Sequence, residues 1–174
     1  SLAVLHGDEK EEDFEGLRED IFTYYGLGCR NVSTLAVPKE YDFRPLTEVL
    51  NRSENIQHHN KYYNNYTYHK AIFLLNQDVH YDSGFYLLRE SDRLNSPVGV
   101  INYFIYNSQV EIEDFLNLNR EGIQCVVSGM DELKELNTVT SFGQAQRPTL
   151  HDYSDNVDTI KFLQEIKHRR SIIE

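Results

Sequence analysis

A cysteine between a glycine and an arginine is the residue of this sequence with the clearest potential for chemistry. Cys29 stands in the run Gly26-Leu27-Gly28-Cys29-Arg30, between a predicted helix and a predicted strand. A thiolate is a strong nucleophile that forms covalent intermediates. Glycines let a carbonyl substrate approach the backbone, Arg30 favours the thiolate, and amide N–H groups in such a loop stabilise an oxyanion. A buried structural cysteine behind a helix cap fits the same pattern, so the local sequence leaves both interpretations open.

The other residues that could do chemistry give weaker patterns. Cys125 lies in the apolar run Gln124-Cys125-Val126-Val127, which predicts a packing role. Two cysteines so far apart support neither a disulfide framework nor a thiolate metal cluster. Four histidines lack the i, i+4 spacing with a nearby glutamate that a helical zinc site needs: His58, His59, His69 and His80. No metal is therefore expected.

Motifs for nucleotide binding and for a serine nucleophile are missing from the sequence. It has no Gly-x-Ser-x-Gly elbow, no phosphate loop and no Gly-x-Gly-x-x-Gly run. The pair Gly26 and Gly28 precedes a predicted strand, whereas the dinucleotide fingerprint follows a strand and opens a helix. The tyrosine-rich tract 58–69 contains one lysine, and it predicts an amphipathic helix packed on a sheet better than a base-stacking surface.

Strand and helix patterns alternate along the chain and supply the frame for Cys29. Strands are predicted at residues 2–5, 34–37, 85–88, 98–106 and 123–127. Helices are predicted at 11–25 with Gly26 as C-cap, from Pro45 onward, at 60–76, behind the capping-box run 108–111, at 131–136, and in a final segment carrying Val157, Ile160, Leu163 and Ile166. This alternation predicts one α/β domain over residues 1–174, with a largely parallel sheet and helices on both faces in three layers.

Composition excludes several classes of function. The chain has 174 residues, of which 40% are hydrophobic, which is enough for a core. The net charge of −11 disfavours nucleic acid and anionic lipid as partners. The one dense basic run, residues 167–170, suits the end of a helix. No apolar run reaches the roughly 20 residues that cross a bilayer. With two separated cysteines, a cytoplasmic location is expected.

Several stretches, in order, resemble a known family. The run from Asp20 to Ser33, Asp-Ile-Phe-Thr-Tyr-Tyr-Gly-Leu-Gly-Cys-Arg-Asn-Val-Ser, followed by Val37-Pro38, is similar to the nucleophile segment of acyl-CoA reductases. These are relatives of the fatty-acid reductase of bacterial luminescence and belong to the aldehyde dehydrogenase superfamily. Further stretches agree, at 60–66 with 70–76, at 96–98, and at 142–144 leading to 158–162. The resemblance covers almost the whole chain.

The resemblance implies an aldehyde dehydrogenase-like catalytic domain, with Cys29 as the nucleophile. The thiol would attack a fatty acyl-CoA or acyl-carrier thioester, and hydride from NADPH or NADH would release an aldehyde. The cofactor would be held mainly by an N-terminal portion absent from this sequence, so the chain is expected to be an excised half that is inactive alone. The resemblance also places Gly28, Arg30 and Asn31 near the substrate or cofactor, and we expect Gln144 and Arg147 to lie near them as well.

The sequence departs from aldehyde-oxidising relatives at two glutamates. One, a base upstream of the cysteine, would lie before Ser1. The other, which contacts the cofactor ribose, falls near Arg93 and has no counterpart here. Acyl reduction needs no hydrolytic water, so the missing base is compatible with reductase activity. The rival hypothesis is a noncatalytic α/β domain that binds a protein partner through its tyrosine-rich helix or acidic surface. An excised domain would also expose apolar surface at its former interface, through which a homo-oligomer could form.

Overall fold

The protein is organised around one mostly parallel β-sheet. The computed structural model describes residues 1–130, 133, 139–150, 152–153 and 157–170. Within them, seven strands follow the order β3-β4-β5-β2-β1-β6-β7, and each neighbouring pair is parallel except β3 with β4. The strands are β1 (Leu2–Val4), β2 (Thr34–Pro38), β3 (Tyr81–Asp82), β4 (Leu87–Glu90), β5 (Val100–Tyr106), β6 (Val126–Ser128) and β7 (Val139–Thr140). This confirms the predicted α/β class.

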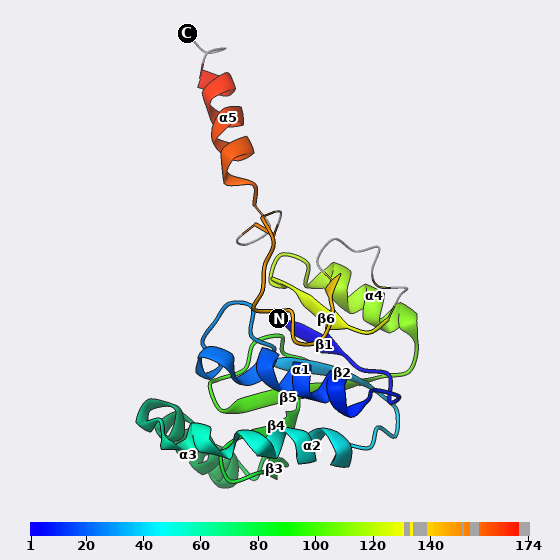
Figure 1. The fold of residues 1–174 in the computed structure, drawn as a ribbon, viewed down its shortest axis with the longest axis vertical. Helices are drawn as coiled ribbons and strands as arrows, with labels where there is room; N and C mark the ends of the chain where they lie inside the picture. Colours follow the sequence, from blue (N-terminus) through cyan, green and yellow to red (C-terminus); the bar gives the residue numbers. More distant parts are fainter. Residues whose placement is uncertain (131–132, 134–138, 151, 154–156, 171–174) are drawn as a thin grey trace.

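Helices lie on both sides of this sheet, and α5 extends away from it, as Figure 1 shows. They are α1 (Glu11–Phe22), α2 (Arg44–Leu50), α3 (Asn60–Asn76), α4 (Gln109–Leu118) and α5 (Thr159–Arg170), with two 3₁₀ segments, η1 (Thr23–Gly26) and η2 (Asn51–His58). One face is covered by α1 and α2, and the opposite face is covered by α4. This arrangement agrees with a layered α/β sandwich of sheet and helices.

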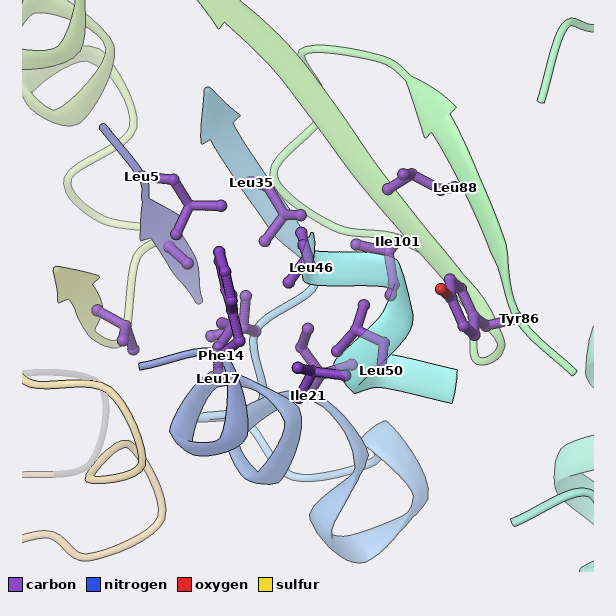
Figure 2. Packing of buried hydrophobic residues seen from close by; sticks show 14 of the residues in the cluster. Leu5, Phe14, Leu17, Ile21, Leu35, Leu46, Leu50, Tyr86, Leu88 and Ile101 are labelled. Carbon is purple, nitrogen blue, oxygen red and sulfur yellow. The ribbon is translucent and has the colours of Figure 1, made fainter. Parts of the chain in front are cut away.

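The larger core lies between the sheet and the helices α1 and α2. Phe14, Leu17 and Ile21 lie on one side of α1 at three- and four-residue steps, and Leu46 and Leu50 of α2 lie beside them (Figure 2). They pack in one cluster with Leu35 of β2 and with Leu5, which follows β1. Leu5, Leu17, Leu35, Leu46 and Leu50 have no exposed surface. A fully buried leucine contributes about 2 kcal/mol to stability, so this core fixes α1 firmly on the sheet.

The opposite face has two smaller clusters. Ile112 and Leu116 of α4 pack on the other set of alternating strand residues, Leu2, Val4, Ala36 and Val126. Tyr66 and Phe73 of α3 pack on Leu87 and Val100. The tyrosine-rich tract therefore packs on the sheet as predicted, since Tyr62 and Tyr66 are both buried.

Most predicted elements are confirmed, with shifts at their ends. The helix at 60–76 matches α3 at both ends. The predicted strands at 85–88, 98–106 and 123–127 begin later, as β4, β5 and β6. The capping box at 108–111 is wrong in part, because the Ser108 side chain makes no cap hydrogen bond and Glu111 accepts from the Asn107 backbone N–H. The predicted helix at 131–136 falls outside the described residues.

The final helix is confirmed as α5, but Val157 precedes it. In Figure 1 it stands away from the sheet. Its apolar side chains Ile160, Phe162, Leu163 and Ile166 are exposed. In the part of the chain that the structure describes, no helix is both long and apolar enough to cross a bilayer.

Candidate active site

The Cys29 loop, residues 27–33, joins η1 to β2 at the edge where the parallel strands begin. The Cys29 side chain is exposed to solvent. Its carbonyl oxygen accepts a hydrogen bond of 3.4 Å from Ser1 Oγ, beside the start of β1. Among the described residues, none accepts a hydrogen bond from the Cys29 amide N–H. A reachable thiol and a free N–H therefore occur on the same residue, as acyl transfer chemistry needs.

The backbone before Cys29 differs from the predicted helix end. The helix α1 ends at Phe22, three residues earlier than predicted, and Gly26 is not its C-cap. Tyr24, Tyr25 and Gly26 follow with φ values of 55°, 59° and 71°. A tyrosine in this left-handed region costs about 1–2 kcal/mol relative to an ordinary helical conformation. The loop thus holds a strained conformation, and neighbouring contacts must maintain it.

Asn31 supplies those contacts. Its Nδ2 donates to the carbonyl oxygens of Asp20, Ile21 and Thr23 at 2.8, 3.1 and 2.9 Å, which are acceptors left free at the end of α1. Its Oδ1 accepts from the Gly28 N–H at 2.7 Å. The Asn31 side chain is only 4% exposed. Asn31 therefore acts inside the protein as a cap for the helix and for the loop.

Gly28 is required by this packing. A Cβ atom at this position would lie 2.8 Å from Asn31 Oδ1 and 3.5 Å from Gln146 Oε1. Because a side chain here would displace the Asn31 cap, the glycine beside Cys29 serves close packing. Its N–H is already used by Asn31, so it is not available to a phosphate group.

A second segment, residues 141–147, closes against the Cys29 loop from the far end of the chain. The buried Asp20 carboxylate accepts hydrogen bonds from the backbone N–H groups of Gly143, at 2.7 Å, and Ala145, at 3.0 Å. Arg30 Nε donates to the Ala145 carbonyl oxygen at 2.5 Å. The residue that follows Cys29 is therefore bonded directly to this segment.

The late residues predicted for the site behave differently from one another. Gln144 and Arg147 are exposed, and Arg147 lies 4.0 Å from Glu19. Gln146 was not predicted to belong to the site. Its Oε1 lies 3.5 Å from the place that a Cβ atom on Gly28 would occupy, and its Nε2 is buried without a hydrogen-bond partner in the described structure. The structure thus places Gly28, Arg30 and Asn31 beside Cys29 in one loop, and Gln146 Oε1 faces Gly28.

Burial controls the electrostatics of this region. Desolvation raises the pKa of Asp20 from 3.8 to about 6, against the opposing effect of the two backbone N–H donors. Glu19 also raises this pKa, whereas Arg147 lowers it. Asp20 was missed by the sequence analysis, although a charged residue on the apolar side of α1, between Leu17 and Ile21, is an available signal.

The second cysteine differs from Cys29 in every relevant respect. Cys125 is 1% exposed, as predicted for a packing residue, and its Sγ lies 3.3 Å from Ser1 Oγ. Burial raises the pKa of the Cys125 thiol, so the reactive thiolate is disfavoured. The two cysteines therefore form an internal comparison between a reachable and an enclosed thiol.

This difference predicts selective alkylation. Because Cys29 is exposed and Cys125 is buried, iodoacetamide should modify Cys29 at least about tenfold faster than Cys125 in the folded protein. Peptide mapping by mass spectrometry at short reaction times measures both rates, and the unfolded protein in urea provides the control in which the rates converge. Equal slow rates in the folded protein would contradict an accessible Cys29.

A groove of about 480 Å³ lies between α1, η1 and η2, on the segment that precedes the Cys29 loop. Tyr25 forms part of its wall, and the Tyr25 ring stacks on His59 with centroids 3.9 Å apart. Cys29 is not among the residues that line this groove. The loop therefore has a concave neighbour, but the thiol itself lies on the open surface.

A cluster of possible metal ligands lies at the opposite edge of the sheet. One ligand atom from each of His6, Asp8 and Glu9 lies within 4.8 Å of the others. The Glu9 carboxylate already accepts from the backbone N–H groups of His6 and Gly7, which explains its position. Nothing else at this turn points to a bound ion, so we assign no metal function to it.

Comparison with known proteins assigns the chain to no family. No model of a known protein family matches it, and no curated protein matches it at a significant level.

Proposed function

We propose that this chain is the nucleophile-bearing domain of a reductase that converts fatty acyl thioesters to aldehydes with NADPH or NADH. The observation that carries the proposal is the exposed Cys29 thiol on a loop whose backbone is held by the buried Asn31. The aldehyde dehydrogenase-like character of the domain is part of the same proposal. The α/β sheet and the order of the resembling stretches support it.

The first step is transfer of the acyl group. The Cys29 thiolate attacks the carbonyl carbon of acyl-CoA or of an acyl carrier, and a new carbon–sulfur bond forms. The negative charge that develops on the carbonyl oxygen is stabilised by the Cys29 N–H, which has no acceptor among the described residues. The original carbon–sulfur bond then breaks, and the CoA or carrier thiolate leaves. Acyl-Cys29 remains.

Reduction of acyl-Cys29 needs two electrons from the nicotinamide cofactor. A bound NADPH or NADH would supply the hydride to the acyl carbon. The carbon–sulfur bond to Cys29 then breaks, which frees the aldehyde and restores the thiolate. The glycine pair before Cys29 does not fit a cofactor phosphate, because the Gly28 N–H is used by Asn31. We therefore propose that residues outside this sequence hold the cofactor, and that this chain supplies Cys29, the N–H group and the loop that presents them.

The proposal is tested by product analysis with the protein that contains this chain. With a long-chain acyl-CoA and NADPH or NADH, it should form one aldehyde for each cofactor oxidised. Gas chromatography measures the aldehyde, and absorbance measures the cofactor. Release of free fatty acid without cofactor oxidation would indicate a thioesterase and contradict the proposal. Residues 1–174 alone should oxidise no cofactor.

A noncatalytic interaction domain is the second candidate. The exposed apolar side chains of α5 favour it, because such surfaces are often covered by a protein partner. In the tyrosine-rich helix, Tyr62 and Tyr66 are buried in the core, so only Tyr63 and Tyr68 are exposed to a partner. Analytical ultracentrifugation would test a homo-oligomer, and slow alkylation of both cysteines would favour this candidate over the reductase.

A further inference from the structure

Asp20 connects the two parts of the chain that meet beside Cys29. Its backbone carbonyl oxygen accepts from Asn31 Nδ2 at 2.8 Å and from the Val32 N–H at 3.1 Å, so it supports the Cys29 loop. Its side-chain oxygens accept from Gly143 and Ala145, so they hold the 141–147 segment. A single residue therefore fixes both parts, from the buried side of α1.

Close backbone packing reinforces this connection. A Cβ atom on Gly16, one turn before Asp20, would lie 2.7 Å from the Phe142 carbonyl carbon and 2.8 Å from the Gly143 nitrogen. Gly143 itself has a φ of 77°, in the region that favours glycine. The 141–147 segment thus rests directly on the backbone of α1, and it has no room to shift toward the helix.

The 141–147 segment is connected to the residues on either side of Cys29. Arg30 Nε donates to the Ala145 carbonyl oxygen, and Gln146 Oε1 lies 3.5 Å from the place that a Cβ atom on Gly28 would occupy. Arg30 is therefore hydrogen-bonded to a segment that Asp20 holds, and the Gln146 side chain of that segment faces Gly28. We propose that Asp20 is a positioning residue for Cys29: its carboxylate clamps the 141–147 segment onto the Cys29 loop and thereby sets how the thiol is presented.

The ionised Asp20 carboxylate does not stabilise the folded protein. Because the folded-state pKa of Asp20 is about 6 and the ordinary value is 3.8, the folded protein binds this proton more tightly than the unfolded protein does. The stabilising contribution of neutral Asp20 is present below pH 3.8 and is lost as pH rises through 6. At neutral pH the ionised group lowers stability, while it gains two N–H donors for the clamp.

Protonation should weaken the clamp, because a neutral carboxyl presents an O–H to one of the two N–H groups. The charged and titratable groups around Asp20 are Glu19 on its own helix, Arg147 within the 141–147 segment, Arg30 in the Cys29 loop, and Cys125 on the sheet side. The Ser1 α-amino group also lies here: it donates to the Asn31 carbonyl oxygen, and burial lowers its pKa. Burial raises the pKa of Cys125, so this thiol stays neutral near pH 6. The Gly143 and Ala145 amides donate to Asp20, whereas Ser1 donates to the Asn31 carbonyl oxygen, so a change in these amides near pH 6 should follow Asp20.

The test compares Asp20→Asn with the wild type. The first measurement is a pair, amide hydrogen exchange and Cys29 alkylation, and it does not depend on the proposed function. Hydrogen exchange of the Gly143 and Ala145 amides is corrected for intrinsic rates, and Cys29 alkylation is corrected for its own titration in urea. In the wild type between pH 8 and pH 5, both should rise through a midpoint near pH 6, with alkylation rising at least about threefold. In Asp20→Asn both should be high and should lack this midpoint.

The second measurement is acyl transfer from acyl-CoA to Cys29, which rests on the proposed function. It should fall at least about tenfold in Asp20→Asn, because a misplaced nucleophile loses orientation. Gly16→Ala, which pushes the segment away while keeping Asp20, should raise alkylation and lower acyl transfer in the same way. Glu12→Gln removes an exposed carboxylate from the same helix and should change neither.

The outcomes separate the two proposals. If the wild type shows no pH midpoint in alkylation, or if Asp20→Asn and Gly16→Ala release the 141–147 segment without changing Cys29 alkylation, Asp20 is only structural and the inference is wrong. If alkylation responds as expected but no variant and no wild-type protein accepts an acyl group, the clamp stands and the reductase proposal fails. Should Asp20→Asn not fold, the wild-type pH profile and Gly16→Ala still decide.

Discussion

Replacement of Cys29 by alanine should abolish aldehyde formation from acyl-CoA, with a loss of at least about 10³-fold, as expected when a covalent nucleophile is removed. The physical reason is that no other described thiol is exposed, since Cys125 lies enclosed in the sheet. The rate of cofactor oxidation measures the loss in the protein that contains this chain.

Cys125→Ala is the matched control for this prediction. It removes a thiol of the same kind from a buried position, so it should lower stability slightly and leave turnover within about threefold of the wild type. If turnover persists in Cys29→Ala and disappears in Cys125→Ala, the assignment of the nucleophile is wrong.

Asn31→Ala should be the most destabilising change in the Cys29 loop. It leaves the Gly28 N–H and the carbonyl oxygens at the end of α1 without the partner that Asn31 provides. Because buried unsatisfied groups cost 1–3 kcal/mol each and water will reach some of them, the free energy of unfolding should fall by about 3 kcal/mol. Urea denaturation followed by circular dichroism measures it.

Asn65→Ala provides the comparison for Asn31. The Asn65 side chain is exposed on α3 and donates one hydrogen bond to the Lys61 carbonyl oxygen. Its removal should change the free energy of unfolding by less than about 0.5 kcal/mol. Similar small effects for both asparagines would show that the Asn31 cap does not hold the loop. A large effect for Asn31 alone supports the account of the loop.

The sequence predicts the elements of this fold better than their ends. Apolar periodicity identifies α1 because Phe14, Leu17 and Ile21 face the core, and it then wrongly extends the helix to Tyr25. The helix ends earlier because Asn31, from the next turn of the chain, binds its last carbonyl groups. Such a contact depends on the folded loop, and the local pattern of tyrosines does not contain it. The α3 helix has clear limits at Asn60 and Asn76, and there the prediction is correct.

The candidate site is predictable only in its local part. The position of Cys29 between a predicted helix and a predicted strand indicates a loop, and the exposed thiol agrees with it. The predicted role of Gly28 differs, because this glycine makes room for the Asn31 side chain. The contacts of Asp20 and Arg30 with the 141–147 segment join residues more than a hundred positions apart. Without the sheet order that brings these ends together, Gln144 and Gln146 look equivalent in the sequence. The structure distinguishes them, because Gln146 is partly buried with its Oε1 facing Gly28, whereas Gln144 is exposed.

The central claim is that the thiol of Cys29 accepts an acyl group, and direct mapping of the adduct tests it. The protein is incubated with a long-chain acyl-CoA without nicotinamide cofactor, digested at low pH and analysed by mass spectrometry. We predict one acyl group, removable by hydroxylamine, on the peptide that contains Cys29. An adduct on Cys125, or no adduct on a Cys29 that iodoacetamide still modifies, would contradict the claim.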